Sequence, residues 1–565
     1  MTAGLAALLL LTAAAGAPQQ AALFDELEPL YPDSDPAGGV LVFESHHARG
    51  TIAGVDVLVT GLDPGSPLTL FSAGAPEAAE PVWYRLHPVP VEENTGLGSR
   101  TEQFQGERNP FVIRRAPFEV FEAMEALQIE AGSDDVPSRR SLPDRHPAIR
   151  SPRPTEALRL EIAVPAEVEV AVWSLEIGVG NGPDLWSMRW RIHVHEAVVP
   201  PSGRDTLRYT NWYSPGEMAR RHGLEPWSEP HWQMIRRYAG LMARGRQNVF
   251  WIPWGEVFAL GDDGQPFLRR QRLERWVRTF REAGLWWIEG APLARRPGGD
   301  WSKDRLELAV AGVLATSPEG RAALARMLGA LEACLVENGW KDAWLQHLAD
   351  EPTDVNAADY RELAAVVREL LPGAPIVEAT MSRELVGAVD VWCPQVQVFQ
   401  AQREFFEQRR AAGDRLWTYT CLVPGGPWLN RLLDQERLRQ VWFGWAAAEY
   451  RLDGFLHWGF NHYKADPFAR SVVDHPAQPG TKNKLPAGDT HVVYPGPDGP
   501  WSGLRFEAHR VGLEDRELLE LLRARDPAAY ERIVARVFRA YDDYETGVAE
   551  YRAAKRELLE ALDDR

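Results

Sequence analysis

The sequence predicts a multidomain β plus α/β protein, in which an N-terminal β-sandwich precedes a (β/α)8 TIM-like barrel and a C-terminal helical tail. Two contrasting patterns predict this fold. Residues 23–199 hold short alternating apolar runs separated by Gly, Pro and Asp, without a long helical period. Residues 206–512 instead alternate short apolar runs with segments of helical period, which is typical of parallel βα units.

The β-sandwich is predicted from short strands in the first 199 residues. These strands lie at 39–44, 55–60, 158–164 and 168–177. Residues 134–154, rich in Arg, Ser, Pro and Asp, indicate a long exposed loop, and the Pro-Pro-Ser-Gly run at 200–203 indicates a linker. The glycines from Gly178 to Gly182 nearly match a GxGxxG motif, but their place among strands favours a turn.

The barrel is predicted from eight strand candidates that alternate with amphipathic helices. The strands lie at 206–214, 248–254, 286–292, 344–351, 376–380, 389–396, 415–421 and 454–460. Four helices show apolar residues at i, i+3, i+4 and i+7, and one of these is predicted to start at an Asp354 cap. A doubly wound open sheet is the alternative, but eight units are more than it needs.

The two ends of the chain carry different signals. Residues 1–17 form an apolar run with Ala15 and Ala17 in the arrangement of a signal peptidase site, and the run is too short to span a bilayer. We therefore expect a secreted or periplasmic bacterial protein without a membrane span. Residues 513–565 are rich in Glu, Arg and Ala and predict two helices packed against the barrel.

Composition excludes several classes of function. The charged residues, 62 basic against 80 acidic, give a net charge of −18, which argues against nucleic acid or an anionic membrane as a partner. Three cysteines are too few for a disulfide framework. The 22 tryptophans suit packing against sugar faces as well as an aromatic core.

No motif for a cofactor or a metal stands out. The sequence lacks the GxxxxGK[ST], HExxH and GxSxG patterns. His193 and His195 would share one face of a strand, but no third ligand accompanies them, so we expect structural histidines and no metal. We expect no cofactor, and the oligomeric state is left open.

The catalytic candidates are Asp350 and Glu351, which end the fourth predicted barrel strand. Active sites of such barrels lie at the carboxyl ends of the strands. Two adjacent carboxylates raise the pKa of one of them, and the retained proton suits a general acid for a glycosidic oxygen. The alternative is a solvated acidic pair before a helix, and the predicted position in the barrel favours the catalytic interpretation.

Aromatic and amide side chains at the other strand ends predict a pocket for a small polar ligand. These residues are Asn211, Trp212, Trp254, Trp392, Gln395, Trp417, Tyr419, Trp458, Asn461 and His462. Glu256, Glu289 and Glu378 lie near further strand ends and are spare carboxylates for an ordinary two-carboxylate mechanism.

Several short motifs, in a specific order, resemble glycoside hydrolase family 123 and its wider kin. They are VPVEENT at 89–95, NP at 109–110, RRAP at 114–117, ADEP at 349–352, WGFN at 458–461, VYPG at 493–496 and RFEA at 505–508. The resemblance covers about residues 80 to 525. It implies an N-terminal β-sandwich with a (β/α) barrel, β-N-acetylgalactosaminidase activity, and a glycan or glycoconjugate as the substrate.

The resemblance also implies roles for individual residues. It implies a substrate-assisted retaining mechanism, in which the sugar's own 2-acetamido oxygen attacks the anomeric carbon and forms an oxazoline. Glu351 would act as the general acid and base, and Asp350 would hold the acetamido N–H. Tyr419 is the candidate donor to the acetamido oxygen, and Trp417 and Trp458 would wall the pocket.

Two other functions remain open at this point. One is a glycosidase for a sugar without a 2-acetamido group, with Glu351 as acid and Glu256, Glu289 or Glu378 as nucleophile. The other is a non-catalytic carbohydrate-binding protein. Activity on 2-hydroxy sugars separates the first from the substrate-assisted enzyme, and the presence of both Asp350 and Glu351 argues against the second.

Overall fold

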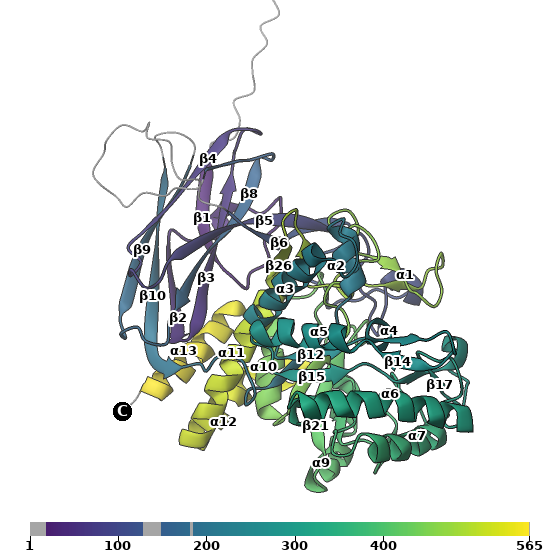
Figure 1. Ribbon diagram of the computed structural model, residues 1–565. Coiled ribbons are helices and arrows are strands. Elements are labelled where there is room, and N and C mark those ends of the chain that lie inside the picture. Colours follow the sequence, from purple (N-terminus) through teal and green to yellow (C-terminus); the bar gives the residue numbers. More distant parts are fainter. Residues whose placement is uncertain (1–18, 128–147, 181–184, 564–565) are drawn as a thin grey trace, which may run out of the picture.

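The computed structural model describes residues 19–127, 148–180 and 185–563. The predicted signal peptide at 1–17, the loop residues 134–147 and Gly182 lie outside the described residues. In Figure 1, a β-rich part formed mainly by the N-terminal chain lies beside an α/β part, and the C-terminal helices lie between them.

Two sheets form the β-rich part. The seven-stranded sheet has the order β1 (Gln20–Asp25), β3 (Thr51–Thr60), β8 (Thr155–Val164), β5 (Pro81–Val91), β6 (Phe118–Ala126), β26 (Pro500–Gly503) and β25 (Tyr494–Pro495). The five-stranded sheet has the order β2 (Val42–Arg49), β10 (Trp186–Val198), β9 (Val172–Gly180), β4 (Pro67–Ala73) and β7 (Ala148–Arg150).

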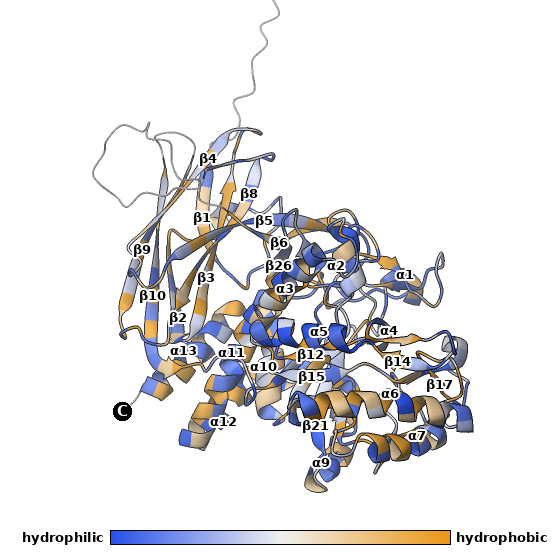
Figure 2. Ribbon diagram, in the orientation of Figure 1, coloured by the Kyte–Doolittle hydropathy of each residue, from blue (hydrophilic) through white to orange (hydrophobic). Residues whose placement is uncertain are grey.

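One apolar core joins these two sheets. It contains Val57 and Leu160 from the first sheet, and Leu175 and Ile192 from the second. Figure 2 shows hydrophobic and hydrophilic residues mixed along the strands of this part. Along β8, β9 and β10 the large apolar residues fall at every second position, because successive side chains of a strand point to opposite faces.

Three predictions for this part were wrong in detail. Strand β9 begins at Val172, because residues 168–171 precede its pairing with β10. Gly178 and Gly180 are paired within β9 rather than in a turn. Residues 148–150 of the predicted loop form β7, which pairs with β4.

Eight parallel strands form the α/β part, and each lies within a predicted segment. They are β11 (Arg208–Asn211), β12 (Val249–Ile252), β15 (Trp287–Gly290), β18 (Trp344–Gln346), β19 (Val377–Ala379), β20 (Val391–Cys393), β21 (Arg415–Thr420) and β22 (Gly454–His457). The order β11-β22-β21-β20-β19 makes one sheet and β12-β15-β18 another. A parallel bridge between Gln346 and Ile376 links β18 to β19, and the Asn248 amide donates to the Tyr209 carbonyl at 3.3 Å between β12 and β11.

Helices separate most of these strands. They are α2 (Pro215–Arg221), α3 (Glu229–Arg244), α4 (Trp254–Val257), α5 (Arg270–Glu282), α6 (Pro318–Glu337), α7 (Ala357–Leu370), α8 (Val396–Ala401), α9 (Arg403–Ala411) and α10 (Arg439–Glu449). Helix α5 buries Leu273, Trp276 and Phe280, as its period predicted. The predicted Asp354 cap was wrong, because α7 starts after Asn356 and the Asp354 carboxylate instead accepts from the Ser382 hydroxyl.

The C-terminal segment forms three helices rather than the two predicted: α11 (Leu504–Arg525), α12 (Pro527–Val537) and α13 (Val548–Asp563). Helix α11 begins before residue 513, inside the segment predicted as barrel. Helix α13 contacts the β-rich part, where Arg552 Nε donates to Asp25 Oδ2 at 2.7 Å and Asp563 accepts from the Glu196 amide at 2.7 Å.

Buried ion pairs hold the β-rich and α/β parts together. Arg505 of α11 pairs with Glu122 of β6 at 2.7 Å, and both side chains are almost fully buried. Arg437, just before α10, lies 3.6 Å from Asp56 of β3. Breaking a buried pair leaves an uncompensated charge, so these contacts fix the two parts relative to each other.

The structure also bears on membrane insertion. Across 19–127, 148–180 and 185–563, no helix combines the length and the apolar character needed to cross a bilayer.

Candidate active site

Asp350 and Glu351 lie just past the carboxyl end of β18, where the chain leaves the parallel sheet. Glu351 has a φ of 49°, a left-handed conformation that is uncommon for a residue with a side chain. Pro352 follows it, and the residue before a proline prefers extended backbone. The surrounding structure must therefore hold Glu351 in this conformation.

Tyr419 and Gln395 connect to Glu351. The Tyr419 hydroxyl, from β21, donates to Glu351 Oε1, and Gln395 Nε2 donates to the same hydroxyl at 3.1 Å. Burial and the negative charge of Glu351 raise the pKa of Tyr419 well above its ordinary value, so the hydroxyl keeps its proton. The structure thus brings together three residues that the sequence placed on separate strand ends.

Asp350 is exposed at the strand ends, yet its ionisation is unfavourable. The surrounding protein desolvates the carboxyl, and the charges of Glu351 and Glu378 add repulsion, so the pKa of Asp350 rises to about 7. His347 and Arg296 oppose this rise. Both protonation states of Asp350 are therefore accessible near neutral pH.

Arg296 approaches the pair from the loop after β16 (Ala294–Arg295). Its Nη1 donates to the Asp350 carbonyl at 3.0 Å, and its Nη2 donates to the Glu351 carbonyl. The guanidinium carbon lies 3.8 Å from the ring centroid of Trp301, which is 54% exposed. No sequence motif marked Arg296, because its position depends on a long loop.

A cavity of about 420 Å³ opens beside these residues, a volume within the range of small-ligand pockets. It is lined by Arg295, Arg296, Gly298, Gly299, Glu307 and Asp350.

His347 lies fully buried between two of the spare carboxylates. Its Nε2 is 2.7 Å from Glu289 Oε1, and its Nδ1 is 3.1 Å from Glu378 Oε1. Burial alone lowers the pKa of His347, but the hydrogen bonds to Glu289 and Glu378 outweigh it and raise the pKa to about 10. The imidazole is therefore a cation that neutralises part of the charge of its neighbours.

Glu289 and Glu378 are themselves fully buried and hydrogen-bonded. Glu289 accepts from Thr210 Oγ1 at 2.8 Å and from Trp212 Nε1 at 2.9 Å. Glu378 accepts from the Tyr360 hydroxyl at 2.8 Å and from two backbone amides. A carboxylate with its lone pairs occupied in this way is a poor nucleophile.

Glu256 is half-buried at the end of α4. Burial raises its pKa, and Arg272 and Arg269 oppose the rise. Its backbone carbonyl accepts from Arg272 Nη1 at 2.8 Å.

Trp212, a predicted strand-end residue of the pocket, and Trp458, a predicted pocket wall, both make polar contacts near the strand ends. Trp212 is 8% exposed, hydrogen-bonds Glu289 and stacks on Trp251 with centroids 4.7 Å apart. Trp458 is half-buried and donates from Nε1 to Asp489 Oδ1 at 3.1 Å. Burial raises the pKa of Asp489 to about 7, and no sequence signal marked this residue.

Three tryptophans are core residues instead. Trp392 is fully buried, donates to Asp414 at 2.9 Å and packs against Phe405, because its neighbours on β20 occupy the inner face of the sheet. Trp254 belongs to α4, and its Nε1 donates to the Ala291 carbonyl. Trp417 shares the inner face with Tyr419 but is fully buried.

The two predicted asparagines are also fully buried and committed to structural contacts. Asn211 accepts from Arg431 Nη1 at 2.6 Å. Asn461 accepts from the Ser214 amide at 2.8 Å and donates to the Ser214 carbonyl at 3.1 Å. Both side chains organise the backbone near the strand ends. His462 is half-buried, and burial lowers its pKa to about 4.

Of the paired histidines of β10, His193 stacks on His46 and His195 is hydrogen-bonded. His195 lies with its Nε2 2.8 Å from His46 Nδ1, and its Nδ1 contacts Asp563 of α13. Within the described part of the chain, no cluster of three or more His, Cys, Asp or Glu side chains has the arrangement of a metal site.

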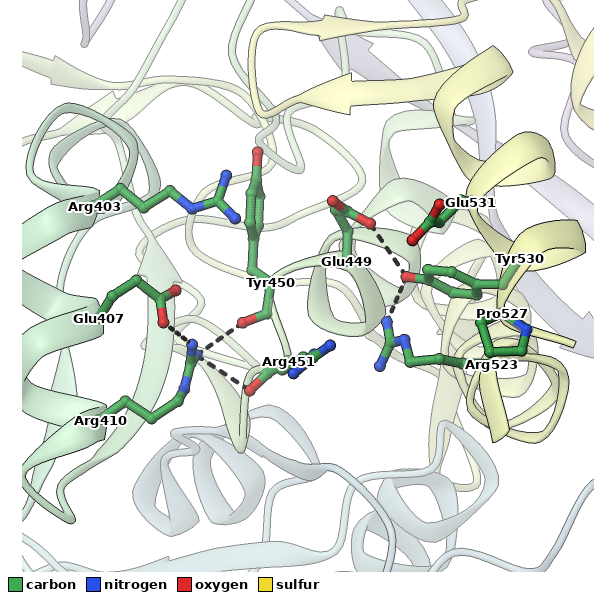
Figure 3. A pocket seen from close by; sticks show the side chains of 10 residues that line it. All are labelled: Arg403, Glu407, Arg410, Glu449, Tyr450, Arg451, Arg523, Pro527, Tyr530 and Glu531. Carbon is green, nitrogen blue, oxygen red and sulfur yellow. Dashed lines mark hydrogen bonds and ion pairs between the residues drawn. The ribbon is translucent and has the colours of Figure 1, made fainter. Parts of the chain in front are cut away.

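A second cavity, of about 380 Å³, lies away from Asp350 (Figure 3). It is lined by Arg403, Glu407, Arg410, Glu449, Tyr450, Arg451, Arg523, Pro527, Tyr530 and Glu531. Tyr450 and Arg451 precede the first residue of β22, so this cavity is at the amino ends of the strands, opposite Asp350. Several of its side chains bond one another, as between Arg410 and Glu407, and none of the predicted site residues lines it.

The α/β part of the chain, which carries the strand-end site, matches a known protein family. Residues 261–522, which include Asp350 and Glu351, match the family model "Glycoside hydrolase 123, catalytic domain". Residues 261–522 are thus a glycoside hydrolase family 123 catalytic domain, and the protein is a glycoside hydrolase. A search of curated protein sequences found no match.

One solved structure shares the fold over almost the whole chain, and two others are more distantly similar. A family 123 glycoside hydrolase from Clostridium perfringens, studied for glycolipid glycan hydrolysis, is 13% identical with a TM-score of 0.69, over 97% of both chains. An endo-β-1,4-mannanase from Thermotoga petrophila is 9% identical with a TM-score of 0.35, over 56% of this chain and 77% of its own. A β-glucuronidase from Bacteroides uniformis is 11% identical with a TM-score of 0.31, over 82% and 50%.

Proposed function

We propose that this glycoside hydrolase removes a β-linked N-acetylhexosamine, specifically N-acetylgalactosamine, with retention and substrate assistance. One observation supports this mechanism above others. Asp350 and Glu351 are adjacent and accessible, whereas Glu289 and Glu378 are buried and bound to His347. A double displacement needs a free carboxylate across the glycosidic bond from the acid, about 5–5.5 Å away. Of the three candidate nucleophiles, Glu289 and Glu378 are occupied, which leaves Glu256 alone for that role.

The proposed reaction uses the substrate as its own nucleophile. Glu351 donates its proton to the glycosidic oxygen while the acetamido oxygen attacks the anomeric carbon, and the bond to the leaving group breaks. Asp350 accepts a hydrogen bond from the acetamido N–H and stabilises the positive charge of the oxazolinium that forms. Glu351 then takes a proton from water, and the resulting hydroxide opens the oxazoline with net retention.

Tyr419 has two successive roles in this proposal. In the free enzyme its hydroxyl donates to Glu351. With sugar bound, we propose that it donates to the acetamido oxygen. A protonated phenol beside Glu351 can donate either to the Glu351 carboxylate or to the acetamido oxygen. Trp212 and Trp458 are the proposed walls for the sugar ring. Both lie next to the strand ends, and their indole N–H groups are held by Glu289 and Asp489.

The natural substrate and the architecture complete the proposal. The Clostridium perfringens relative acts on glycolipid glycans, and we propose a glycan of this class for the present enzyme.

We propose a secreted or periplasmic location. The two N-terminal sheets are proposed to be a β-sandwich, and the eight strands a closed (β/α)8 barrel, supported by the links between β18 and β19 and between β11 and β12.

Hydrolysis of aryl β-glycosides tests the proposal directly. The panel holds the 2-acetamido and the 2-hydroxy forms of galactose and glucose, with Glu351→Gln as the matched inactive variant. We expect nitrophenol release only from 2-acetamido sugars, faster with the galacto form. Comparable turnover of a 2-hydroxy sugar by the wild type would overturn the substrate-assisted mechanism.

A further inference from the structure

The backbone that carries Asp350 and Glu351 is held by side chains from two other parts of the chain. Glu378, on the neighbouring strand β19, accepts with Oε2 from the Leu348 amide and from the Ala349 amide, each at 3.1 Å. The Tyr360 hydroxyl of α7 fixes the same oxygen at 2.8 Å. These two amides immediately precede Asp350.

Arg296, in the loop after β16, binds the next two residues of the same segment. It donates to the carbonyls of Asp350 and Glu351, and its guanidinium stacks on Trp301. Four consecutive residues, 348–351, thus each have one backbone polar group taken by a side chain. Such bonds restrict the backbone torsions of the segment more than any single side-chain contact does.

The segment needs this restraint. Glu351 adopts a φ of 49° directly before Pro352, a combination that an unrestrained chain avoids. Strained conformations persist only where the surrounding structure over-determines them. The other oxygen of the fully buried Glu378 carboxyl, Oε1, lies 3.1 Å from Nδ1 of the His347 imidazole, so both oxygens of this side chain are held.

We propose that Glu378 and Arg296 are positioning residues, which together fix the turn at 348–351 and thereby aim the Asp350 and Glu351 carboxylates at the substrate. The kinetic part of this proposal rests on the proposed function. The structural part concerns the backbone alone and is measurable without turnover.

The test compares Glu378→Met with Glu289→Met in the full-length protein. Both remove a fully buried carboxylate that contacts His347, but only Glu378 binds the 348–349 amides. Hydrogen exchange of a peptide covering 344–352 reports on those amides. We expect faster exchange in Glu378→Met, and exchange near wild type in Glu289→Met. Equal exchange in the two variants would overturn the proposal, whatever the activity.

Kinetics then separate positioning from general structure. On the 2-acetamido aryl glycoside, Glu378→Met is expected to lower kcat about 10- to 100-fold with little change in KM, as misplacement of reacting groups does. Glu378→Gln, which keeps an acceptor oxygen, should recover part of this loss. A loss of thermal stability with unchanged kcat would show that Glu378 is only structural and would contradict the proposal.

Arg296→Met provides an independent test, because Arg296 lies on a half-buried loop and its removal leaves the buried network intact. We expect a lower kcat and partial recovery in Arg296→Lys. A silent wild type on the whole glycoside panel would refute the proposed function, while the hydrogen-exchange comparison would still decide whether the segment is held. Unchanged kcat in Arg296→Met would remove Arg296 from the proposal.

Discussion

Two pairs of carboxylates lie at the same end of the parallel strands, and their surroundings differ completely. Glu289 and Glu378 are fully buried, and each accepts several hydrogen bonds from the protein. Asp350 is exposed and Glu351 is half-buried, with Tyr419 as the side-chain donor to its carboxylate. The protein therefore completes the hydrogen bonds of the buried pair and leaves Asp350 and Glu351 available to a ligand.

Burial, rather than hydrogen bonding, separates the tryptophans. The indole N–H groups of Trp392, Trp254 and Trp458 all donate to the protein, but Trp392 and Trp254 are buried and Trp458 is half-buried beside the strand ends. Residue type at a strand end is therefore a weaker guide to function than the exposure of the side chain.

The largest expected effect comes from Glu351→Gln, which removes the proposed general acid. We expect kcat/KM for the 2-acetamido aryl glycoside to fall by about 10²–10⁴-fold. The loss should be smaller for a dinitrophenyl leaving group, because that group departs without protonation. An equal loss for both leaving groups would contradict the role of Glu351 as acid, and with it the functional difference between the accessible and the buried carboxylates.

Asp350→Asn should lower kcat/KM by about 10²–10³-fold, since it removes charge stabilisation at the transition state. It should also raise the melting temperature at pH 8. The folded pKa of about 7 exceeds the ordinary 3.8, so the folded state binds the extra proton between these values and loses stability as pH rises through them. Melting curves at pH 5 and pH 8 check this. A gain that is larger at pH 5 would refute it.

Tyr419→Phe tests the one side-chain donor described for the Glu351 carboxylate, because it removes the hydroxyl that contacts Glu351. A hydrogen bond to a charged group contributes about 1.5–3 kcal/mol, which corresponds to roughly 10- to 100-fold in kcat/KM. The phenylalanine keeps the ring packing, so the melting temperature should change little. Steady-state kinetics and thermal unfolding measure the two quantities. Wild-type kcat/KM in this variant would remove Tyr419 from the mechanism.

The smallest effect on activity is expected from Trp392→Phe, with Trp458→Phe as its counterpart. Trp392→Phe should destabilise the fold by about 1–3 kcal/mol and leave KM unchanged, because the side chain packs away from the site. Trp458→Phe should raise KM several-fold with a smaller effect on stability. A raised KM in Trp392→Phe together with an unchanged KM in Trp458→Phe would show that burial does not distinguish core tryptophans from pocket tryptophans.

Much of this organisation was accessible from the sequence. Periodicity located all eight parallel strands, and the end of the fourth strand selected Asp350 and Glu351. It did not separate Trp392 from the pocket residues, because a shift of one position along a strand moves a side chain to the other face. Arg296 and Asp489 were missed, since they come from irregular segments whose paths only the folded chain defines.

The late position of β26 has a consequence for synthesis. This strand, at Pro500–Gly503, pairs with β6, which ends at Ala126, so the seven-stranded sheet needs residues from both sides of the α/β part. At roughly 5–20 residues per second, a ribosome takes about 20–75 s to translate the stretch between them. During that time β6 emerges with an unpaired edge, which is a site for association with other chains. The enzyme's exposure to aggregation is thus set by the order of its strands as well as by its final stability.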